Sequence, residues 1–282
     1  MSLIPTKVFF FYFHPTMYHL GFLLLLGISS IVSAHENFDP HLFPRPLIVQ
    51  YPDSLKLELK ESDEELLLQC TSWRFAAETN NLNPWKTIPS ECAGYVKDYV
   101  TGRGYLVDLE RVSKEAIAYA RSVQLVGDGK DAWIFDIDET LLSNLPYYAD
   151  HGYGLEVFDG REFDKWVEKA MAPVIESSLK LYEEVLELGF KVFLLTGRSE
   201  RHRSVTIENL RDAGFQNWDK LILRNLGDNG KSATLYKSER RSEMVNEGYR
   251  ILGNSGDQWS DLLGSSTSNR SFKLPNPMYY IP

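Results

Sequence analysis

Two carboxylates two residues apart, Asp136 and Asp138, directly follow the apolar residues 133–135. An apolar run of this kind, bounded by polar residues, is typical of a buried strand. In open α/β sheets, ligands bind beyond the carboxyl ends of such strands, so both side chains are expected at a ligand site. There they can bind a metal ion, or divide the roles of nucleophile and acid between them.

Phosphate-binding groups follow a second predicted strand. Thr196, Gly197 and Arg198 end the apolar run that begins at residue 191, where a hydroxyl and free backbone N–H groups suit an oxyanion or a phosphate. Lys237 can supply a positive point charge to the same phosphate. These residues favour a ligand that carries an oxyanion.

A second pair of carboxylates, Asp257 and Asp261, follows the predicted strand at residues 249–253. Carboxylates gathered at several strand ends form a set of hard oxygen ligands, which suits Mg²⁺. A cation there would offset the repulsion among Asp136, Asp138 and Asp257. Taken singly, each of these motifs more often marks a turn, a helix cap or a solvated lysine, so the site hypothesis depends on their order along the chain.

The periodicity of the chain changes near residue 130. Residues 51–124 are mainly helical in pattern, with a loop at 80–84 and a break near Gly102 and Gly104. From residue 131, strands are predicted at 191–196, 220–224 and 249–253, and helices at 178–188, 200–213 and 233–246. This alternation predicts an α/β fold, a parallel sheet flanked by crossover helices, preceded by a helical N-terminal extension.

The first 34 residues read as a secretory signal. They contain one Lys, no Arg, no Asp or Glu, an apolar stretch at 21–28 and small residues before His35. Cleavage after Ala34 divides the chain into a signal peptide at 1–34, a helical extension at 35–130 and a catalytic core at 131–282. A second apolar cluster at 8–13 keeps an uncleaved membrane anchor open as the alternative. The expected location is the cell exterior, the cell wall or the vacuole.

The composition of the chain limits which binding partners and which cellular compartment are expected. The chain has 39 acidic and 30 basic residues, a net charge of −9, which argues against nucleic-acid binding. No stable membrane association is expected after cleavage, and a homodimer is neither required nor excluded. In an oxidising compartment Cys70 and Cys92 are expected to form a disulfide, and two reduced thiols are the alternative if the signal interpretation is wrong. The glycosylation sequon at Asn269 fits the same route.

Taken in order, residues 136–140, the run 196–198, Lys237 and the pair Asp257 and Asp261 resemble the four motifs of the haloacid dehalogenase superfamily. The wider segments 135–148, 193–198 and 256–262 are similar to those of plant acid phosphatases of the class B type and of vegetative storage proteins. The resemblance covers nearly all of the chain after the signal. It implies a Rossmannoid core with a helical N-terminal extension, and acid phosphatase activity on small phosphomonoesters.

The resemblance also implies catalytic roles. Asp136 attacks phosphorus and becomes an aspartyl-phosphate, while Asp138 protonates the leaving alkoxide and then helps to activate water. Thr196, Gly197 and Lys237 bind the transferring phosphoryl group. Spacing before the lysine motif varies, so Lys231 is the alternative lysine.

The implied cofactor is Mg²⁺. Its ligands are Asp136, the backbone carbonyl of Asp138 and Asp257, with Asp261 as a further ligand or an orienting group. Glu139 and Arg198 are expected to support the site from behind these ligands.

Three alternatives to a phosphatase stay open. The protein can serve mainly as a storage reserve, although the presence of Asp136 favours an enzyme. An acceptor other than water would make it a phosphotransferase, and a phosphate-binding module would need no nucleophile.

Tyr147, Tyr148 and Tyr153 can form an aromatic lid or be packing residues, and His202 is expected on a surface helix.

Overall fold

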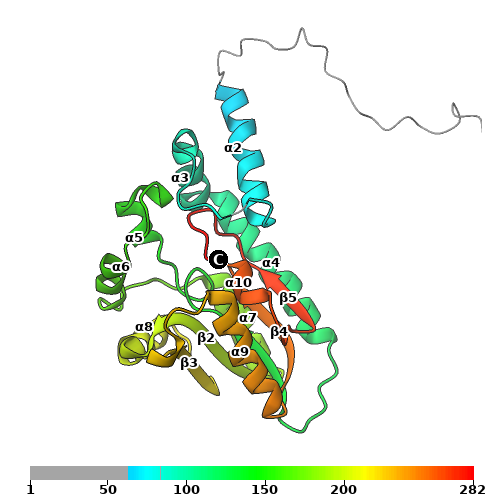
Figure 1. Ribbon diagram of the computed structural model, residues 1–282. Coiled ribbons are helices and arrows are strands. Elements are labelled where there is room, and N and C mark those ends of the chain that lie inside the picture. The colour runs from blue at the N-terminus through cyan, green and yellow to red at the C-terminus, as the bar shows by residue number, and fades with distance from the viewer. Residues whose placement is uncertain (1–62, 83) are drawn as a thin grey trace, which may run out of the picture. The chain divides into compact units, whose positions relative to one another are not determined.

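A five-stranded parallel sheet forms the centre of the computed structural model, which describes residues 63–82 and 84–282 (Figure 1). Its strands are β1 (Asp131–Phe135), β2 (Lys191–Ser199), β3 (Lys220–Arg224), β4 (Arg250–Gly256) and β5 (Arg270–Lys273), in the spatial order β3-β2-β1-β4-β5. Every neighbouring pair is parallel, so all the strands end at the same edge of the sheet. The residues that follow the central strand β1 therefore lie in the middle of that edge.

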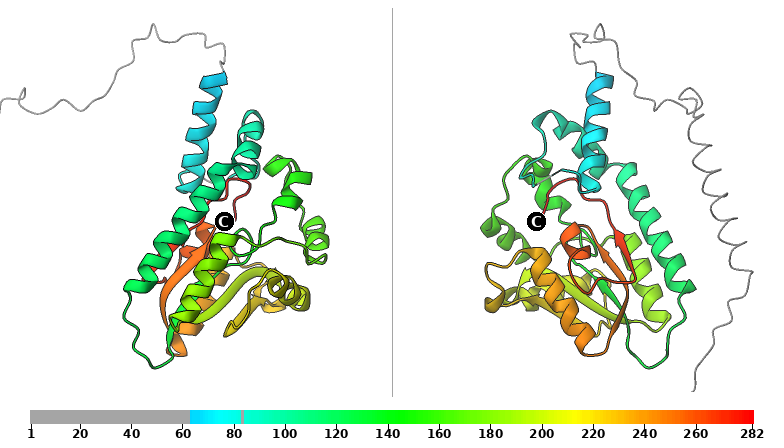
Figure 2. Two further views of the ribbon diagram at one scale, coloured as in Figure 1. Left: turned by 180° about the vertical axis from the view of Figure 1, so that it is seen from behind. Right: turned by 45° about the vertical axis from the view of Figure 1, so that its right-hand side comes forward.

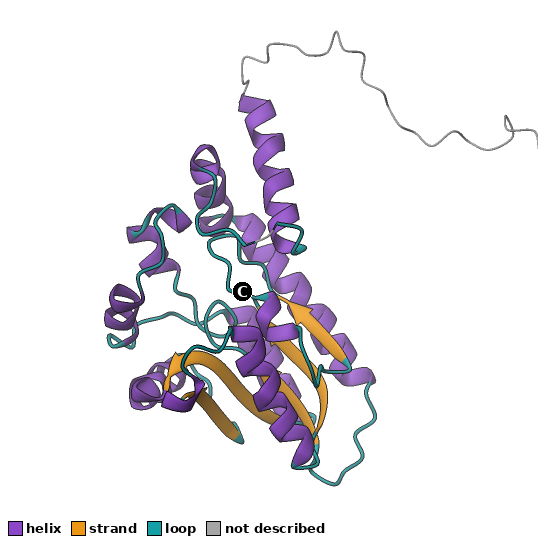
Figure 3. Cartoon of the chain, in the orientation of Figure 1, coloured by secondary structure: helices purple, strands orange, loops and turns teal. Residues whose placement is uncertain are grey.

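Helices cover both faces of the sheet (Figure 3). One face is covered by α4 (Arg103–Ser122), α7 (Glu176–Glu187) and α8 (Arg203–Asp212), and the other by α9 (Ala233–Asn246). Trp133 and Phe135 pack on the first face, and Ala132 and Ile134 on the second. This alternation follows from the two-residue period of a strand, and both faces are apolar because both are buried.

A second, smaller core joins three distant parts of the chain. The N-terminal part contributes α2 (Asp63–Glu78), η2 (Ser90–Cys92) and α3 (Ala93–Thr101), and an insertion after β1 contributes α5 (Leu145–Asp150), η3 (Gly152–Gly154) and α6 (Gly160–Val167). Val96 of α3, Tyr148 of α5 and Met278 near the C-terminus are all buried there. Figure 2 shows the insertion on the same side of the sheet as α3, with the C-terminus close to both.

A disulfide between Cys70 and Cys92 joins α2 to η2, with a Cα–Cα distance of 5.4 Å. Both sulfur-bearing residues are buried. The predicted pair is therefore bonded in the structure, and it fixes the N-terminal helices to each other.

The predicted α/β fold is confirmed. Strand β3 and helix α9 have the predicted bounds, and β2 runs past Thr196 to Ser199. The sequence pattern does not predict β5 or the insertion helices. The signal at 1–34 and the helical pattern at 51–62 lie outside the described residues. The described residues before 123 are largely helical, as predicted for the extension. However, α4 of this extension packs on α7 in the main core. The domain boundaries at 34 and 130 stay predictions.

Within the described part of the chain, no helix combines the length and the apolar character needed to cross a bilayer.

Candidate active site

The turn after β1 gathers the carboxylates of the site. Asp136 continues the pairing with β4, because its backbone N–H donates to the Ser255 carbonyl at 2.9 Å. The chain then folds back on Ile137, whose carbonyl accepts the N–H groups of residues 140–142 at 2.9 to 3.3 Å. Glu139 in this turn has a φ of 54°, the left-handed region that non-glycine residues rarely adopt. As a result, Asp136 and Asp138 line one and the same cavity.

Lys237 reaches the buried Asp136 from α9. Its Nζ donates to Asp136 Oδ1 at 2.6 Å and also to Asp261 Oδ1. The exposed fractions of the three side chains are 7% or less. An ammonium in this position offsets the charge of two carboxylates that would otherwise repel each other away from water.

Lys231, the alternative lysine, lies in a different environment. Its Nζ contacts Asp228 at 3.0 Å and also Glu239, instead of Asp136. Of the two candidates, the structure therefore brings Lys237 to the carboxylate after β1.

Asp138 is held by a guanidinium and an amide. Arg198, near the end of β2, donates from Nη2 and Nε to Asp138 Oδ1 at 2.8 and 3.1 Å, and Asn144 Nδ2 donates to the same oxygen at 2.9 Å. Thr196 Oγ1 donates to Asp138 Oδ2 at 3.4 Å. The predicted oxyanion-binding strand end thus lies beside Asp138, as the parallel arrangement of β1 and β2 requires.

The second pair of carboxylates completes the cluster. Asp257 directly follows β4, and Asp261 lies on the short helix α10 (Trp259–Leu262). One carboxylate oxygen each from Asp136, Asp257 and Asp261 lies within 4.8 Å of the others. Thr140 bridges two of them, because its Oγ1 lies 3.4 Å from Asp257 Oδ1 and 3.5 Å from Asp136 Oδ2.

Burial raises the pKa values of the clustered acids. The pKa of Asp136 lies well above its ordinary value because of burial, which the charge of Lys237 opposes and the neighbouring carboxylates reinforce. Burial also raises the pKa of Asp257 to about 7, and the charges of Asp261 and Glu139 add to the effect. The cluster therefore holds more negative charge than its surroundings stabilise.

The pKa values of Lys237 and Asp138 shift toward the charged forms. Burial lowers the pKa of Lys237, but the charges of Asp136 and Asp261 outweigh it and raise the pKa above the ordinary value. Burial raises the pKa of Asp138, but Arg198 outweighs burial and holds the pKa below the usual range.

This donor set fits a hard divalent cation. Three buried carboxylates converge, whereas Lys237 is the one cation that contacts two of them among the described residues. Mg²⁺ binds carboxylate oxygens and would offset the negative charge of Asp136 and Asp257, whose pKa values are raised by burial first and by the neighbouring carboxylates second.

Comparison with known proteins identifies the family. The model of the HAD superfamily, subfamily IIIB (Acid phosphatase), matches residues 54–282. The chain belongs to this acid phosphatase family. It is 67% identical over 258 residues to Acid phosphatase 1 of Solanum lycopersicum, which covers 92% of this chain and 98% of the relative. It is 43% identical over 272 residues to Vegetative storage protein 2 of Arabidopsis thaliana, which covers 93% of this chain and 98% of the relative.

A solved structure supports the same fold. The class C acid phosphatase from Bacillus anthracis matches with a TM-score of 0.55 and 21% sequence identity, covering 67% of this chain and 85% of that chain. The chain is thus an enzyme of the acid phosphatase class, whose substrates are small phosphoesters.

The site of this acid phosphatase opens into a cavity of about 710 Å³. Asp136, Asp138 and Lys237 line it together with Gly197 and Arg198. Aromatic side chains from the insertion and the tail also line the cavity: Tyr148, Phe158, Phe163, Tyr279 and Tyr280. The volume exceeds what a phosphate group needs, so the cavity has room for the leaving group of a phosphomonoester.

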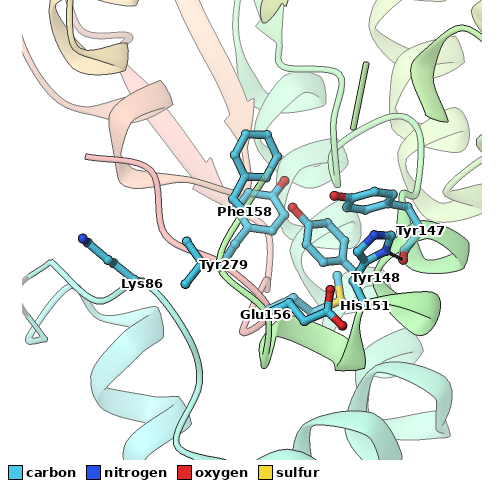
Figure 4. Close-up of a pocket in the computed structure, with 9 residues that line it drawn as sticks. Lys86, Tyr147, Tyr148, His151, Glu156, Phe158 and Tyr279 are labelled. Atoms are coloured by element: carbon cyan, nitrogen blue, oxygen red, sulfur yellow. Dashed lines mark hydrogen bonds between the residues drawn. The ribbon is translucent and has the colours of Figure 1, made fainter. Parts of the chain in front are cut away.

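Tyr147 and Tyr148 of the insertion line a small pocket beside this cavity (Figure 4). Tyr148 stacks on Tyr279 with ring centroids 5.0 Å apart, and Tyr147 meets Tyr148 edge-on at 5.1 Å. Of the three predicted lid residues, Tyr148 lines the main cavity, while Tyr147 and Tyr153 belong to the packing of the smaller core.

His202 is buried, with 3% of its surface exposed, so the prediction of a surface position was wrong. It ends the short helix η4 (Glu200–His202), which packs against α6. Its ring nitrogens lie 3.7 Å from Asp164 and 3.7 Å from Glu168. The local sequence is polar, and the contacts with Asp164 and Glu168 come from a segment more than 30 residues earlier in the chain.

Glu139, which the sequence predicts to support the site, shares the hydrogen-bond donor Asn144 with Asp138. It is fully buried and accepts hydrogen bonds from Asn144 Nδ2 at 3.1 Å and Tyr279 Oη at 2.5 Å. Burial and the charge of Asp138 raise the pKa of Glu139 to about 7, against the effect of these hydrogen bonds. Sequence reasoning missed Asn144 and Tyr279, which carry no periodic or charge signal.

Asn269, the predicted glycosylation position, is exposed at the start of the edge strand β5. Its backbone N–H donates to the Ile251 carbonyl at 2.9 Å.

Proposed function

We propose that this acid phosphatase hydrolyses phosphomonoesters through an aspartyl-phosphate on Asp136, with Mg²⁺ as its cofactor. The observation that carries the proposal is the contact between Lys237 and Asp136 at the end of the central strand, with Asp138 on the same cavity. A nucleophile, a counter-charge and a proton donor thereby face one space that has room for a substrate.

In the first half-reaction, a carboxylate oxygen of Asp136 attacks phosphorus and the bond from phosphorus to the leaving oxygen breaks. Asp138 gives its proton to that oxygen, and Arg198 and Asn144 keep Asp138 in place for the transfer. Because Arg198 holds the pKa of Asp138 low, Asp138 carries its proton more often in acid than at neutral pH, and the acid role is favoured in acid conditions. Thr196, Gly197 and Lys237 are suited to bind the transferring oxygens.

In the second half-reaction, water attacks phosphorus, the bond from phosphorus to Asp136 breaks, and Asp138 takes the proton of the water. Inorganic phosphate then leaves, Asp136 is again a carboxylate, and Asp138 again carries its proton. An alcohol that replaced the water would give phosphotransfer by the same steps.

Asp136, Asp257 and Asp261 would hold the Mg²⁺ ion, with the Asp138 carbonyl as the further ligand that the resemblance implies. When bound, the ion neutralises charge on the nucleophile and on the phosphoryl oxygens.

The test is hydrolysis of an aryl phosphate by the mature chain from about pH 4 to 8, with Mg²⁺ or with a chelator, beside Asp136→Asn. This substitution keeps the shape and removes the nucleophile, so turnover should vanish in a folded protein. Asp150→Asn is the matched control, because Asp150 is exposed on α5 and should leave turnover unchanged. Equal turnover in Asp136→Asn and wild type would rule out the nucleophile.

A storage role is the second candidate, supported by the similarity to Vegetative storage protein 2 of Arabidopsis thaliana. In the same assay, no measurable turnover by either wild type or Asp136→Asn across several phosphomonoesters would favour storage over catalysis.

We also propose that the chain follows the secretory route to the cell exterior or the vacuole. The signal-like residues 1–34, the Cys70–Cys92 disulfide and the exposed Asn269 support this route. Mass spectrometry of the protein from its native tissue should find an N-terminus at His35 and a glycan on Asn269. Light scattering of the same sample measures whether the protein is a monomer or a homodimer.

A further inference from the structure

Residues 274–278 of the C-terminal tail are buried, and the tail contacts the carboxylates of the active site. Leu274, Asn276 and Met278 have exposed fractions of 4%, 4% and 2%, although chain ends are usually exposed and poorly held. The tail after β5 also carries Tyr279 into the aromatic group of the insertion (Figure 4).

Asn276 contacts one of the clustered carboxylates directly. Its Nδ2 donates to Asp257 Oδ2 at 2.7 Å, and Gln258 Nε2 donates to the same oxygen at 3.0 Å. The other oxygen, Oδ1, lies on the side of Thr140, which contacts both Asp257 and Asp136. Two amides therefore occupy Oδ2, and Oδ1 is left to face the cluster.

The orientation of the Asn276 amide is fixed by its other contacts. Its Oδ1 accepts the backbone N–H of Met278 at 2.9 Å, so its Nδ2 must be the group that faces Asp257. Its backbone N–H donates to Glu78 Oε1 at 2.8 Å, and Lys273 Nζ donates to Glu78 Oε2 at 2.8 Å. The end of α2 therefore holds the tail on both sides of Pro275.

Gln258 ties the tail to the loop that follows β4. Its Nε2 donates to the Tyr279 carbonyl at 3.1 Å, and its Oε1 accepts the Ile281 N–H at 3.0 Å. The residue next to Asp257 is thus bound by the tail as well, so removal of the tail contacts would free both donors to Asp257 Oδ2.

We propose that Asn276 is a positioning residue that fixes the Asp257 carboxylate for cation binding. The inference rests on the Mg²⁺ site of the proposed function. It assigns to the C-terminal tail, held by Glu78 of α2, the task of keeping Asp257 Oδ1 directed at Asp136 and Asp261. Partners of this kind, hydrogen-bonded behind a metal ligand, typically change metal affinity 10–100-fold when removed.

The test is Mg²⁺ titration of the full mature chain by calorimetry, for wild type, Asn276→Ala, Asn209→Ala and Asp257→Asn. Asn209 of α8 is an equally buried amide whose side chain bonds the Ala172 backbone, so its loss removes a buried amide that does not contact the clustered carboxylates. We expect the Mg²⁺ Kd to rise about 10–100-fold in Asn276→Ala and to stay at the wild-type value in Asn209→Ala.

A second readout separates positioning from general damage. With an aryl phosphate as substrate, the kcat of Asn276→Ala should be low at limiting Mg²⁺ and should return to near the wild-type value as the Mg²⁺ concentration rises. If Asn276→Ala fails to fold, Asn276→Leu keeps the volume without the donor and takes its place. A Kd equal to that of wild type in a folded variant would overturn the inference.

The outcome for Asp257→Asn shows which proposal fails. If Asp257→Asn and wild type bind Mg²⁺ equally, the proposed cation site itself is wrong, and the inference falls with it. If Asp257→Asn loses Mg²⁺ binding while Asn276→Ala keeps it, the cation site stands and only the positioning role is overturned.

Discussion

Lys237 Nζ lies 2.6 Å from Asp136 Oδ1, although 101 residues separate the two along the chain. The contact links the helix on one face of the sheet with the end of its central strand. Because both groups are buried, removing Lys237 leaves the Asp136 carboxylate without this counter-charge, whereas removing Asp136 leaves Lys237 paired with Asp261. The pair therefore contributes to the integrity of the site as well as to its chemistry.

Lys237→Met should lower kcat for aryl phosphates by about 10²–10³-fold, because the transferring phosphoryl group loses its nearest cation. Lys231→Met is the matched control, since Lys231 pairs with Asp228 and Glu239 instead. Steady-state kinetics of the two variants, at equal protein stability, show which lysine binds the phosphoryl group. A larger loss of kcat in Lys231→Met would reverse the assignment of the phosphate-binding lysine.

Arg198→Ala should slow the chemical step most for substrates with poor leaving groups. The guanidinium orients Asp138 through contacts of 2.8 and 3.1 Å, and a poor leaving group depends most on proton donation. We expect kcat to fall about 10²-fold for an alkyl phosphate and less for a nitrophenyl phosphate. A plot of log kcat against leaving-group pKa for both enzymes gives the measurement, and identical slopes would contradict the role of Arg198.

The strand ends could be predicted from sequence because their signals are local. Asp136 follows β1 directly, residues 196–198 lie in the last part of β2, and Asp257 follows β4 directly. Parallel strands bring these ends together at one edge of the sheet. The order of these motifs then carries the family resemblance. The same reasoning located β3 and α9 to the residue.

The remaining features depend on contacts between distant segments. Strand β5 has one buried residue, Phe272, so it carries no apolar run. Asn276 and Tyr279 reach Asp257 and Glu139 only because the tail returns across the site. His202 lies under an insertion that the local polar sequence does not reveal. None of these positions has a period or a spacing that a sequence pattern could detect.

Removal of the Cys70–Cys92 disulfide should lower the free energy of unfolding by about 3 kcal/mol, the value expected for a loop closed over 22 residues. The bond joins α2 to η2, and α2 carries Glu78, which holds the C-terminal tail. Urea denaturation of Cys70→Ser/Cys92→Ser beside wild type measures the change. The double variant avoids a free thiol, and an unchanged denaturation midpoint would contradict the expectation.

Asp228→Asn should destabilise the protein at neutral pH and cease to do so in acid. Burial raises the pKa of Asp228, but Lys231, the Asn225 backbone N–H and Arg240 outweigh it and hold the pKa below the ordinary value. A carboxyl whose folded pKa is depressed stabilises the fold above its unfolded pKa, about 3.9, and loses that contribution as the pH falls through the folded pKa.

The difference in unfolding free energy between wild type and Asp228→Asn should therefore be constant, at about 1 kcal/mol, from about pH 5 to 7. It should shrink as the pH falls from about 4 toward 2, where the wild-type carboxyl becomes protonated. Urea denaturation at a series of pH values tests this, with Asp150→Asn as the exposed control. A difference that grows in acid would mean that the ion pair with Lys231 does not hold Asp228 in its charged form.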